Sequence, residues 1–317
     1  MIHLEQNEMT PPTFLDVSSY ALWKRCEAHY AFRSLLGLTM PDGKIALDYG
    51  SAVHRAMPFL QRGNLLGALA AFESSWTEAL KKKTFEEDTK RNCVCAQKML
   101  MKWYVERYKA DRIPYDIIEP LRTGIEPSER YSDQEFAFSV SLEEGGGPEC
   151  LSFCGRIDGL SKCKTTKGTW PIEYKTTSEL TSRFVSSFTL NSQLIGYATA
   201  VSLLQREPVE GVFVEALRVT SSDQANLCVP VRIEPFKISA FIDSFRKVSA
   251  EILEATRTGD FDQDFSACAP YAQFGSHGYQ CEFALLCGSP DWRSMLDAFV
   301  VDFWCPFKEE TEGVTQS

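Results

Sequence analysis

Two carboxylates and a lysine stand close together in the segment from residue 155 to 175. Asp158 follows an apolar stretch, and Glu173 and Lys175 stand on either side of Tyr174 in a short run with strand character. Side chains alternate along a strand, so Glu173 and Lys175 share one face. Two neighbouring carboxylates repel each other, so they either share a proton or hold a cation. Hard oxygen ligands beside a lysine suit Mg²⁺-dependent hydrolysis of a phosphodiester.

These residues are expected to meet in a β-hairpin. Residues 151–160 are predicted to form one strand and residues 172–175 the other, with the polar segment 161–169 as the turn. Pairing of the two strands would place Asp158 beside Glu173. The alternative is an ordinary exposed hairpin with a cross-strand ion pair, which would contribute little to stability.

Three further polar side chains lie on predicted helices. His54 follows Gly50 by one helical turn at the start of a helix, and an imidazole beside carboxylates favours Mn²⁺ as well as Mg²⁺. Gln193 and Tyr197 are four residues apart, so they share one face of a helix that is expected to start at about residue 191. That face could reach one phosphate or one base. The alternative is a helix with two ordinary polar residues.

Eleven cysteines are many for a chain that is expected in a reducing compartment, so metal binding is considered before disulfides. Cys268, Cys281 and Cys287 fall in a loop-rich segment. Three thiolates make an incomplete site and need a fourth ligand. Cys26 could supply it, and so could His277, which would suit zinc. Unrelated thiols in a loop are the plain alternative.

Composition limits the protein class without defining it. A chain of 317 residues with 44% hydrophobic content can form one large domain or two smaller ones. The net charge of -10 does not suggest a general nucleic-acid coat, although a local basic channel can still steer DNA. No apolar run is long enough to span a membrane and the first residues lack a signal-peptide pattern, so a cytoplasmic location is expected. Residues 1–13 are expected to form a loose arm.

The motifs follow one another in a characteristic order, which is Cys26, Gly50-x-x-x-His54, Asp158, Glu173-x-Lys175, Gln193-x-x-x-Tyr197, Cys268 and Cys281-x5-Cys287. This order resembles the PD-(D/E)XK nuclease superfamily, and within it the RecB-like iron–sulfur exonuclease branch. That branch includes CRISPR-associated RecB-like exonucleases, AddAB-type nuclease domains and phage-encoded relatives. Many relatives show a Cys-x-x-Cys where this chain has Gly278, which leaves the identity of the third cluster ligand open.

The resemblance implies a role for each residue. The implied ligands of Mg²⁺ or Mn²⁺ are His54, Asp158, Glu173 and the carbonyl of Tyr174. The implied catalytic residues are Asp158, Glu173 and Lys175, and the implied DNA contacts are Gln193 and Tyr197. The implied ligands of a structural [4Fe–4S] cluster are Cys26, Cys268, Cys281 and Cys287.

The same resemblance implies an α/β fold with a mixed central β-sheet flanked by helices, a restriction-endonuclease-like core. It implies a single domain over residues 1–317, with a helical insertion at about 55–112 and an iron–sulfur region formed by Cys26 and residues 265–290. The implied activity is a metal-dependent DNA exonuclease that acts on a free DNA end in recombination, repair, phage DNA metabolism or CRISPR adaptation. Any helicase or recombination partner would be a separate chain. The alternatives are a non-catalytic DNA-binding or adaptor protein on the same fold, and a sequence-specific or structure-specific endonuclease.

Overall fold

The computed structural model describes residues 1–41, 45–82, 87–126, 133–142, 151–268 and 281–307. The chain forms two compact units, each made of three segments. Unit 1 comprises Met1–Pro41, Ser139–Cys154 and Ser239–Trp304, and unit 2 comprises Asp42–Phe138, Gly155–Ile238 and Cys305–Ser317. A packing unit need not fold independently, so the expectation of a single domain stays a prediction.

Unit 2 is built on a five-stranded mixed sheet. In spatial order its strands are β10 (Ala225–Arg232), β9 (Gly211–Arg218), β8 (Thr169–Thr177), β7 (Gly159–Cys163) and β4 (Tyr115–Ile118). Strands β8 and β9 pair in parallel, and the other neighbours pair antiparallel. Parallel neighbours need a crossover connection, and here it contains the short helix α6 (Ser182–Ser186) and the helix α7 (Ser192–Gln205). The predicted mixed α/β architecture is confirmed.

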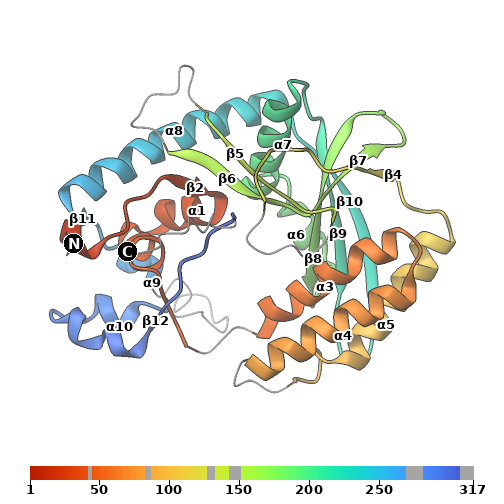
Figure 1. Ribbon diagram of the computed structural model, residues 1–317, viewed down its shortest axis with the longest axis horizontal. Helices are drawn as coiled ribbons and strands as arrows, with labels where there is room; N and C mark the ends of the chain where they lie inside the picture. The colour runs from red at the N-terminus through yellow and green to blue at the C-terminus, as the bar shows by residue number, and fades with distance from the viewer. Residues whose placement is uncertain (42–44, 83–86, 127–132, 143–150, 269–280, 308–317) are drawn as a thin grey trace, which may run out of the picture. The chain divides into compact units, whose positions relative to one another are not determined.

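Three helices cover one face of this sheet. They are α3 (Ile45–Gln61), α4 (Leu65–Lys82) and α5 (Cys93–Trp103), and the π-helical turn η3 (Tyr104–Lys109) continues the last of them (Figure 1). Trp76 and Trp103 from the helices share a buried cluster with Tyr115, Tyr174 and Phe213 from the sheet. Buried aromatic rings contribute much of the apolar area of such a core, so this cluster fixes the helices on the sheet.

The helical region begins earlier than the sequence indicated. Helix α3 starts at Ile45, so His54 lies in the middle of the helix and not at its start. The physical reason is that Tyr49, Ala52 and Val53 are all buried in the core and extend the apolar face of the helix toward its N-terminus.

Unit 1 contains the N-terminal helices and most of a long helix. Helix α1 (Val17–Arg25) begins at the N-cap Asp16, whose carboxylate accepts hydrogen bonds from the backbone N–H groups of Ser18 and Ser19. After Cys26 the chain continues as α2 (Glu27–Tyr30) and the π-helical turn η2 (Ala31–Leu35). The long helix is α8 (Pro235–Thr258), of which the part from Ser239 onward belongs to unit 1. Its Phe245 packs against Tyr20 and Phe153.

The remaining strands form smaller sheets of two or three strands. Strand β2 (Phe14–Asp16) pairs in parallel with β6 (Ser152–Ile157), in a sheet of order β2-β6-β5 that includes β5 (Phe136–Val140). Two antiparallel pairs are formed by β1 (Ile2–His3) with β11 (Asp260–Phe261) and by β3 (Leu38–Thr39) with β12 (Val300–Val301). The short helices are η1 (Gln6–Glu8), α9 (Phe265–Cys268), α10 (Ala284–Cys287) and η4 (Trp292–Ala298).

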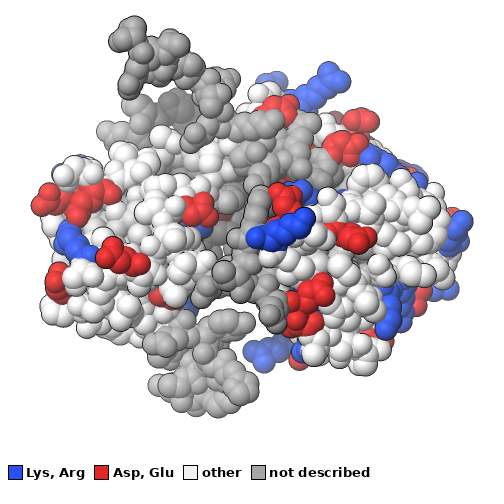
Figure 2. Space-filling view, turned by 60° about the horizontal axis from the view of Figure 1, so that its bottom comes forward, with Lys and Arg blue, Asp and Glu red and all other residues white. Residues whose placement is uncertain are grey.

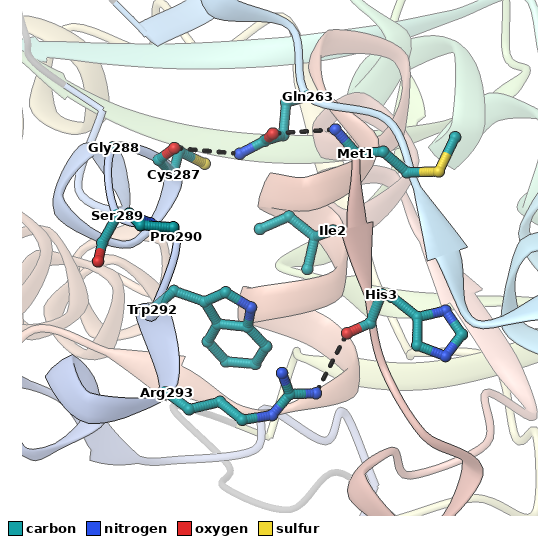
Figure 3. A pocket seen from close by; sticks show the side chains of 10 residues that line it. All are labelled: Met1, Ile2, His3, Gln263, Cys287, Gly288, Ser289, Pro290, Trp292 and Arg293. Atoms are coloured by element: carbon teal, nitrogen blue, oxygen red, sulfur yellow. Dashed lines mark hydrogen bonds between the residues drawn. The ribbon is translucent and has the colours of Figure 1, made fainter.

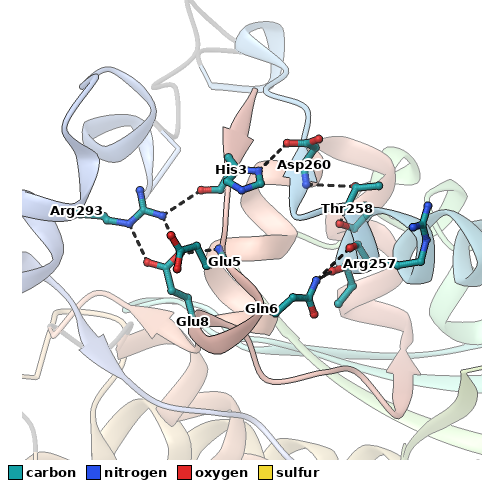
Figure 4. A network of polar contacts seen from close by, with 10 residues as sticks. His3, Glu5, Gln6, Glu8, Arg257, Thr258, Asp260 and Arg293 are labelled. Carbon is teal, nitrogen blue, oxygen red and sulfur yellow. Dashed lines mark hydrogen bonds and ion pairs between the residues drawn. The ribbon is translucent and has the colours of Figure 1, made fainter.

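The prediction of a loose N-terminal arm is wrong. Besides the pairing of β1 with β11, Arg293 donates two hydrogen bonds to the carboxylate of Glu8, at 2.8 and 2.7 Å, and one to the carbonyl of His3 at 3.2 Å (Figure 4). The imidazole of His3 in turn lies 2.8 Å from the carboxylate of Asp260. All these partners stand near the far end of the sequence, so the local pattern of the first residues could not reveal them.

A pocket of about 390 Å³ lies in unit 1 beside the same N-terminal strand (Figure 3). Gln263 crosses it, because its amide donates to the carbonyl of Cys287 at 3.3 Å and its side-chain oxygen accepts from the amine of Met1 at 2.9 Å. The pocket therefore places Cys287 at the border of a solvent-accessible space.

The surface carries both signs of charge. On the face that Figure 2 shows, basic and acidic side chains are interspersed among uncharged residues. Within the described ranges, no helix is both long and apolar enough to cross a membrane.

Candidate active site

Asp158 lies in the bend between β6 and β7. Gly159 pairs with Ile172, which brings Asp158 beside the middle of β8. The carboxylate oxygen Oδ2 of Asp158 accepts a hydrogen bond from the backbone N–H of Tyr174 at 2.9 Å. The structure thus brings Asp158 next to Glu173, as the hairpin prediction required.

The details of the predicted hairpin differ from the structure. The stretch that was predicted as one strand is divided at Asp158 into β6 and β7. Strand β7 continues to Cys163 through residues that were assigned to the turn, because Leu160 and Ser161 are fully buried and pair with β8. Burial in the sheet therefore prevails over the polar local sequence.

The two ring nitrogens of His54 each lie close to an oxygen atom of the site. Its Nδ1 lies 3.4 Å from Oδ1 of Asp158, and its Nε2 lies 3.0 Å from the carbonyl oxygen of Tyr174. Burial lowers the pKa of His54, but the charge of Asp158, its hydrogen bond and the charge of Glu173 outweigh burial and raise the pKa above its usual value. The imidazole is consequently held between a carboxylate and a backbone carbonyl.

The two carboxylates differ in their affinity for a proton. Burial raises the pKa of Asp158, but His54 and the N–H of Tyr174 outweigh this effect and lower the pKa overall. Glu173 is 2% exposed, and burial together with the charge of Asp158 raises its pKa to about 6. Asp158 therefore stays ionised, while Glu173 is the position where an added proton or cation relieves the repulsion.

Lys175 forms an ion pair with the carboxylate of Glu173 on the same face of β8. Burial lowers the pKa of Lys175, but the charge of Glu173 and its hydrogen bond outweigh this and raise the pKa above its usual value. The ammonium group thus stays protonated and contributes a fixed positive charge at this point.

Gln193 and Tyr197 lie at the same place, on one face of α7. Gln193 accepts a hydrogen bond from the ammonium of Lys175 at 2.9 Å, and its amide donates to Glu173 at 3.2 Å and to the hydroxyl of Tyr197 at 2.9 Å. Asn191 caps the helix by accepting hydrogen bonds from the backbone N–H groups of Gln193 and Leu194. In this structure the amide of Gln193 orients Lys175 and Glu173, whereas its contact with DNA stays a prediction.

The donor set fits a hard divalent cation chemically. The carboxylates of Asp158 and Glu173 and the carbonyl of Tyr174 offer oxygen atoms, and His54 offers a nitrogen, which together suit Mg²⁺ or Mn²⁺. In the part of the chain that the structure describes, no group of three or more His, Cys, Asp or Glu side chains is arranged to hold a metal ion. Lys175 places a positive charge beside the carboxylates through its ion pair with Glu173.

The four cysteines that the sequence singled out all belong to unit 1. Burial raises the pKa of Cys268 to about 11, and the charges of Cys281, Cys287 and Cys26 add to this effect, so the four thiols lie within electrostatic reach of one another. The backbone N–H of Cys281 donates to the carbonyl of Cys268 at 3.1 Å. His277, the alternative ligand for zinc, and Gly278 lie outside the described residues.

One residue beside these cysteines was missed by the sequence analysis. The Nδ1 atom of His29 lies 3.7 Å from the sulfur of Cys281, and its Nε2 lies 3.5 Å from a carboxylate oxygen of Glu282. Burial raises the pKa of the Cys281 thiol, but the hydrogen bond with His29, together with the backbone N–H of Phe283 and the charges of His29 and Arg25, outweighs burial and lowers the pKa. The available signal was the position of His29 three residues after Cys26, about one helical turn away.

Comparison with protein-family models gives a match to the PD-(D/E)XK nuclease superfamily over residues 15–288. The chain belongs to this superfamily. The matched range includes every residue of the candidate active site and all four cysteines described above. The superfamily prediction is therefore confirmed, and membership of the RecB-like iron–sulfur branch stays a prediction.

Among solved structures, the chain is similar to a candidate exonuclease from Eubacterium rectale. The identity is 12%, the similarity covers 79% of this chain and 84% of that chain, and the TM-score is 0.48. At this TM-score the likeness carries no argument about function. No curated protein matches the chain.

Proposed function

We propose that this nuclease hydrolyses the phosphodiester bonds of DNA from a free end in a metal-dependent reaction. The observation that carries the proposal is the meeting of Asp158, Glu173 and Lys175 at one place in unit 2, in a chain that belongs to a nuclease superfamily. Two carboxylates with one fixed ammonium match the needs of phosphodiester hydrolysis, which requires a hard cation and a stabilised anionic transition state.

A Mg²⁺ or Mn²⁺ ion held by Asp158, Glu173 and the Tyr174 carbonyl, with His54 beside them, would acidify a bound water and neutralise charge on the scissile phosphate. Lys175, kept protonated by Glu173, stabilises the negative charge that develops on the phosphate. Gln193 fixes the direction of the ammonium, and Tyr197 fixes the amide of Gln193. Gln193 and Tyr197 would also border the path of the DNA strand.

The proposed action at DNA ends and the proposed biological process both rest on the order of the motifs in the sequence. That order favours the RecB-like branch, and from it we infer action at DNA ends in recombination, repair, phage DNA metabolism or CRISPR adaptation. A helicase or another recombination protein would then act as a separate partner chain.

The proposal is tested with end-labelled linear duplex DNA and closed circular DNA, each with Mg²⁺, Mn²⁺ or EDTA. Linear DNA is expected to shorten from its ends with either metal, while closed circles stay intact and EDTA stops the reaction. Cutting of closed circles would favour an endonuclease. Protein that binds metal and DNA and leaves both substrates intact would favour the DNA-binding or adaptor function.

We also propose that Cys26, Cys268, Cys281 and Cys287 hold a [4Fe–4S] cluster with a structural role. The mutual influence of their charges and the lowered pKa of Cys281 support a shared site for thiolate ligands. A cluster there would join the helix that ends at Arg25 to the segment at 265–290. Because the loop it closes is long, the crosslink would stabilise unit 1 considerably.

Anaerobically purified protein is expected to contain iron and acid-labile sulfide and to absorb visible light. The Cys26→Ser and Cys287→Ser variants are expected to lose most of the iron and to unfold at a temperature lower by about 5 °C or more, as for a lost crosslink. Cys228→Ser, which alters a half-buried thiol in unit 2, is the control and should keep its iron. Zinc in place of iron, or equal iron in all variants, would contradict the proposal.

A further inference from the structure

One helix, α3, contacts Tyr174 at its backbone carbonyl and at its side-chain hydroxyl. Its ring lies on the opposite face of β8 from Glu173, in the core cluster, and its hydroxyl donates to the side-chain oxygen of Gln61 at 2.9 Å. Gln61 follows His54 by seven residues on α3, so the two side chains share a face of that helix. His54 lies 3.0 Å from the carbonyl oxygen of the same tyrosine.

The contact continues as a buried chain of hydrogen bonds. The amide nitrogen of Gln61 donates to the hydroxyl of Tyr115 at 3.0 Å, and that hydroxyl donates to the carboxylate of Glu215 at 2.8 Å. Glu215 is fully buried, and it also accepts hydrogen bonds from Trp103 at 3.2 Å and from Arg107 at 3.3 Å. The negative end of the chain is thus neutralised by a guanidinium.

The direction of every hydrogen bond in this chain is fixed. An ionised carboxylate can only accept, so Tyr115 must donate its proton to Glu215. The oxygen of Tyr115 then accepts from the amide nitrogen of Gln61, which leaves the amide oxygen to accept from Tyr174. The side chains are at most 8% exposed, so a broken link would leave a buried polar group without water as a substitute partner. This chain of hydrogen bonds therefore holds the phenol of Tyr174 in a single position.

The position of the phenol controls the position of the peptide. The N–H of Tyr174 binds Asp158, and the carbonyl of Tyr174 contacts His54. Because Glu173 and Lys175 flank this residue, a rotation of Tyr174 would move both of their side chains. A core of Phe and Leu would fill the same space without the demands of a buried polar chain, which points to a role beyond packing.

We propose that Gln61, Tyr115 and Glu215 are positioning residues, which fix Tyr174 and thereby hold the oxygen atoms that receive the catalytic cation. The inference rests on the proposed metal-dependent function. It assigns a function to residues on the side of β8 that faces away from the reacting groups.

The test is direct binding of Mn²⁺ by isothermal titration calorimetry to protein freed of loosely bound metal. Tyr174→Phe is expected to raise the dissociation constant about tenfold, as for the loss of one hydrogen bond that orients the site. Tyr115→Phe, one link further away, is expected to raise it about threefold. Tyr49→Phe, on the helix α3 that carries His54 and Gln61, is the matched control, because the buried Tyr49 hydroxyl has no hydrogen-bond partner among the described residues. It should leave Mn²⁺ binding within about twofold of wild type.

Thermal unfolding in EDTA separates a positioning role from a structural one. If Tyr174→Phe and Tyr115→Phe unfold at a lower temperature than wild type but bind Mn²⁺ equally well, the hydrogen-bond chain is only structural and the inference is wrong. If wild type binds Mn²⁺ and both variants bind it more weakly, the inference holds even when wild type does not cleave DNA, an outcome that contradicts the proposed function alone. If wild type does not bind Mn²⁺, both the proposed metal-dependent function and the inferred positioning role are wrong.

Discussion

Replacement of Lys175 by alanine is expected to lower metal-dependent DNA cleavage by about 10²–10³-fold, as for the removal of a group that stabilises developing charge in a transition state. The side chain of Lys175 is 32% exposed, so its ammonium is accessible to a phosphate while Glu173 and Gln193 keep it in place. The variant should keep its fold but be less stable than wild type, because the buried Glu173 loses its ion-pair partner, so the rates are compared well below the unfolding temperature of both proteins.

The rate is measured as initial cleavage of linear DNA at saturating Mg²⁺. Lys162→Ala on the adjacent strand β7 is the control, because its ammonium donates to Thr169 at 2.8 Å and not to the candidate site. Cleavage by Lys175→Ala within tenfold of wild type would remove Lys175 from the catalytic residues. Lys175→Arg keeps the charge in a different geometry and should recover part of the rate.

Replacement of Glu173 by glutamine is expected to abolish cleavage and yet to stabilise the metal-free protein. Burial and Asp158 raise the pKa of Glu173 to about 6 from an ordinary value of 4.5. Because the folded pKa is raised, the stability that protonated Glu173 provides is lost as the pH rises from 4.5 to 6. At pH 8 the buried carboxylate therefore costs on the order of 2 kcal/mol, which the neutral amide avoids.

The free energy of unfolding is measured by urea denaturation at pH 8, in EDTA and in Mg²⁺. Mg²⁺ should raise the free energy of unfolding of wild type, because the cation binds only the folded protein. It should raise that of Glu173→Gln little, because the variant lacks one of the proposed ligands. Glu215→Gln on the adjacent strand is the contrasting variant. It leaves Arg107 without its buried partner and should destabilise the protein by about 3 kcal/mol. A Glu173→Gln protein that is less stable than wild type in EDTA would contradict the expectation.

Local spacing in the sequence determined much of the candidate site. Alternation along β8 put Glu173 and Lys175 on one face, and the four-residue spacing on α7 put Gln193 beside Tyr197. These relations depend only on the geometry of one strand or one helix, which neighbouring residues define. The mixed α/β architecture and the superfamily followed from the order of such short motifs.

Long-range packing decided the rest. The contact of Asp158 with the N–H of Tyr174, that of His54 with the carbonyl of Tyr174, and the pairing of the first strand with β11 all join residues that are not neighbours in sequence. The chain from Tyr174 through Gln61 to Glu215 has the same character, since its hydrogen bonds cross 113, 54 and 100 residues. The sequence alone determined which side chains share a face, because that depends on local backbone geometry. Only the tertiary structure decided which faces meet, because burial in a common core selects among many possible partners.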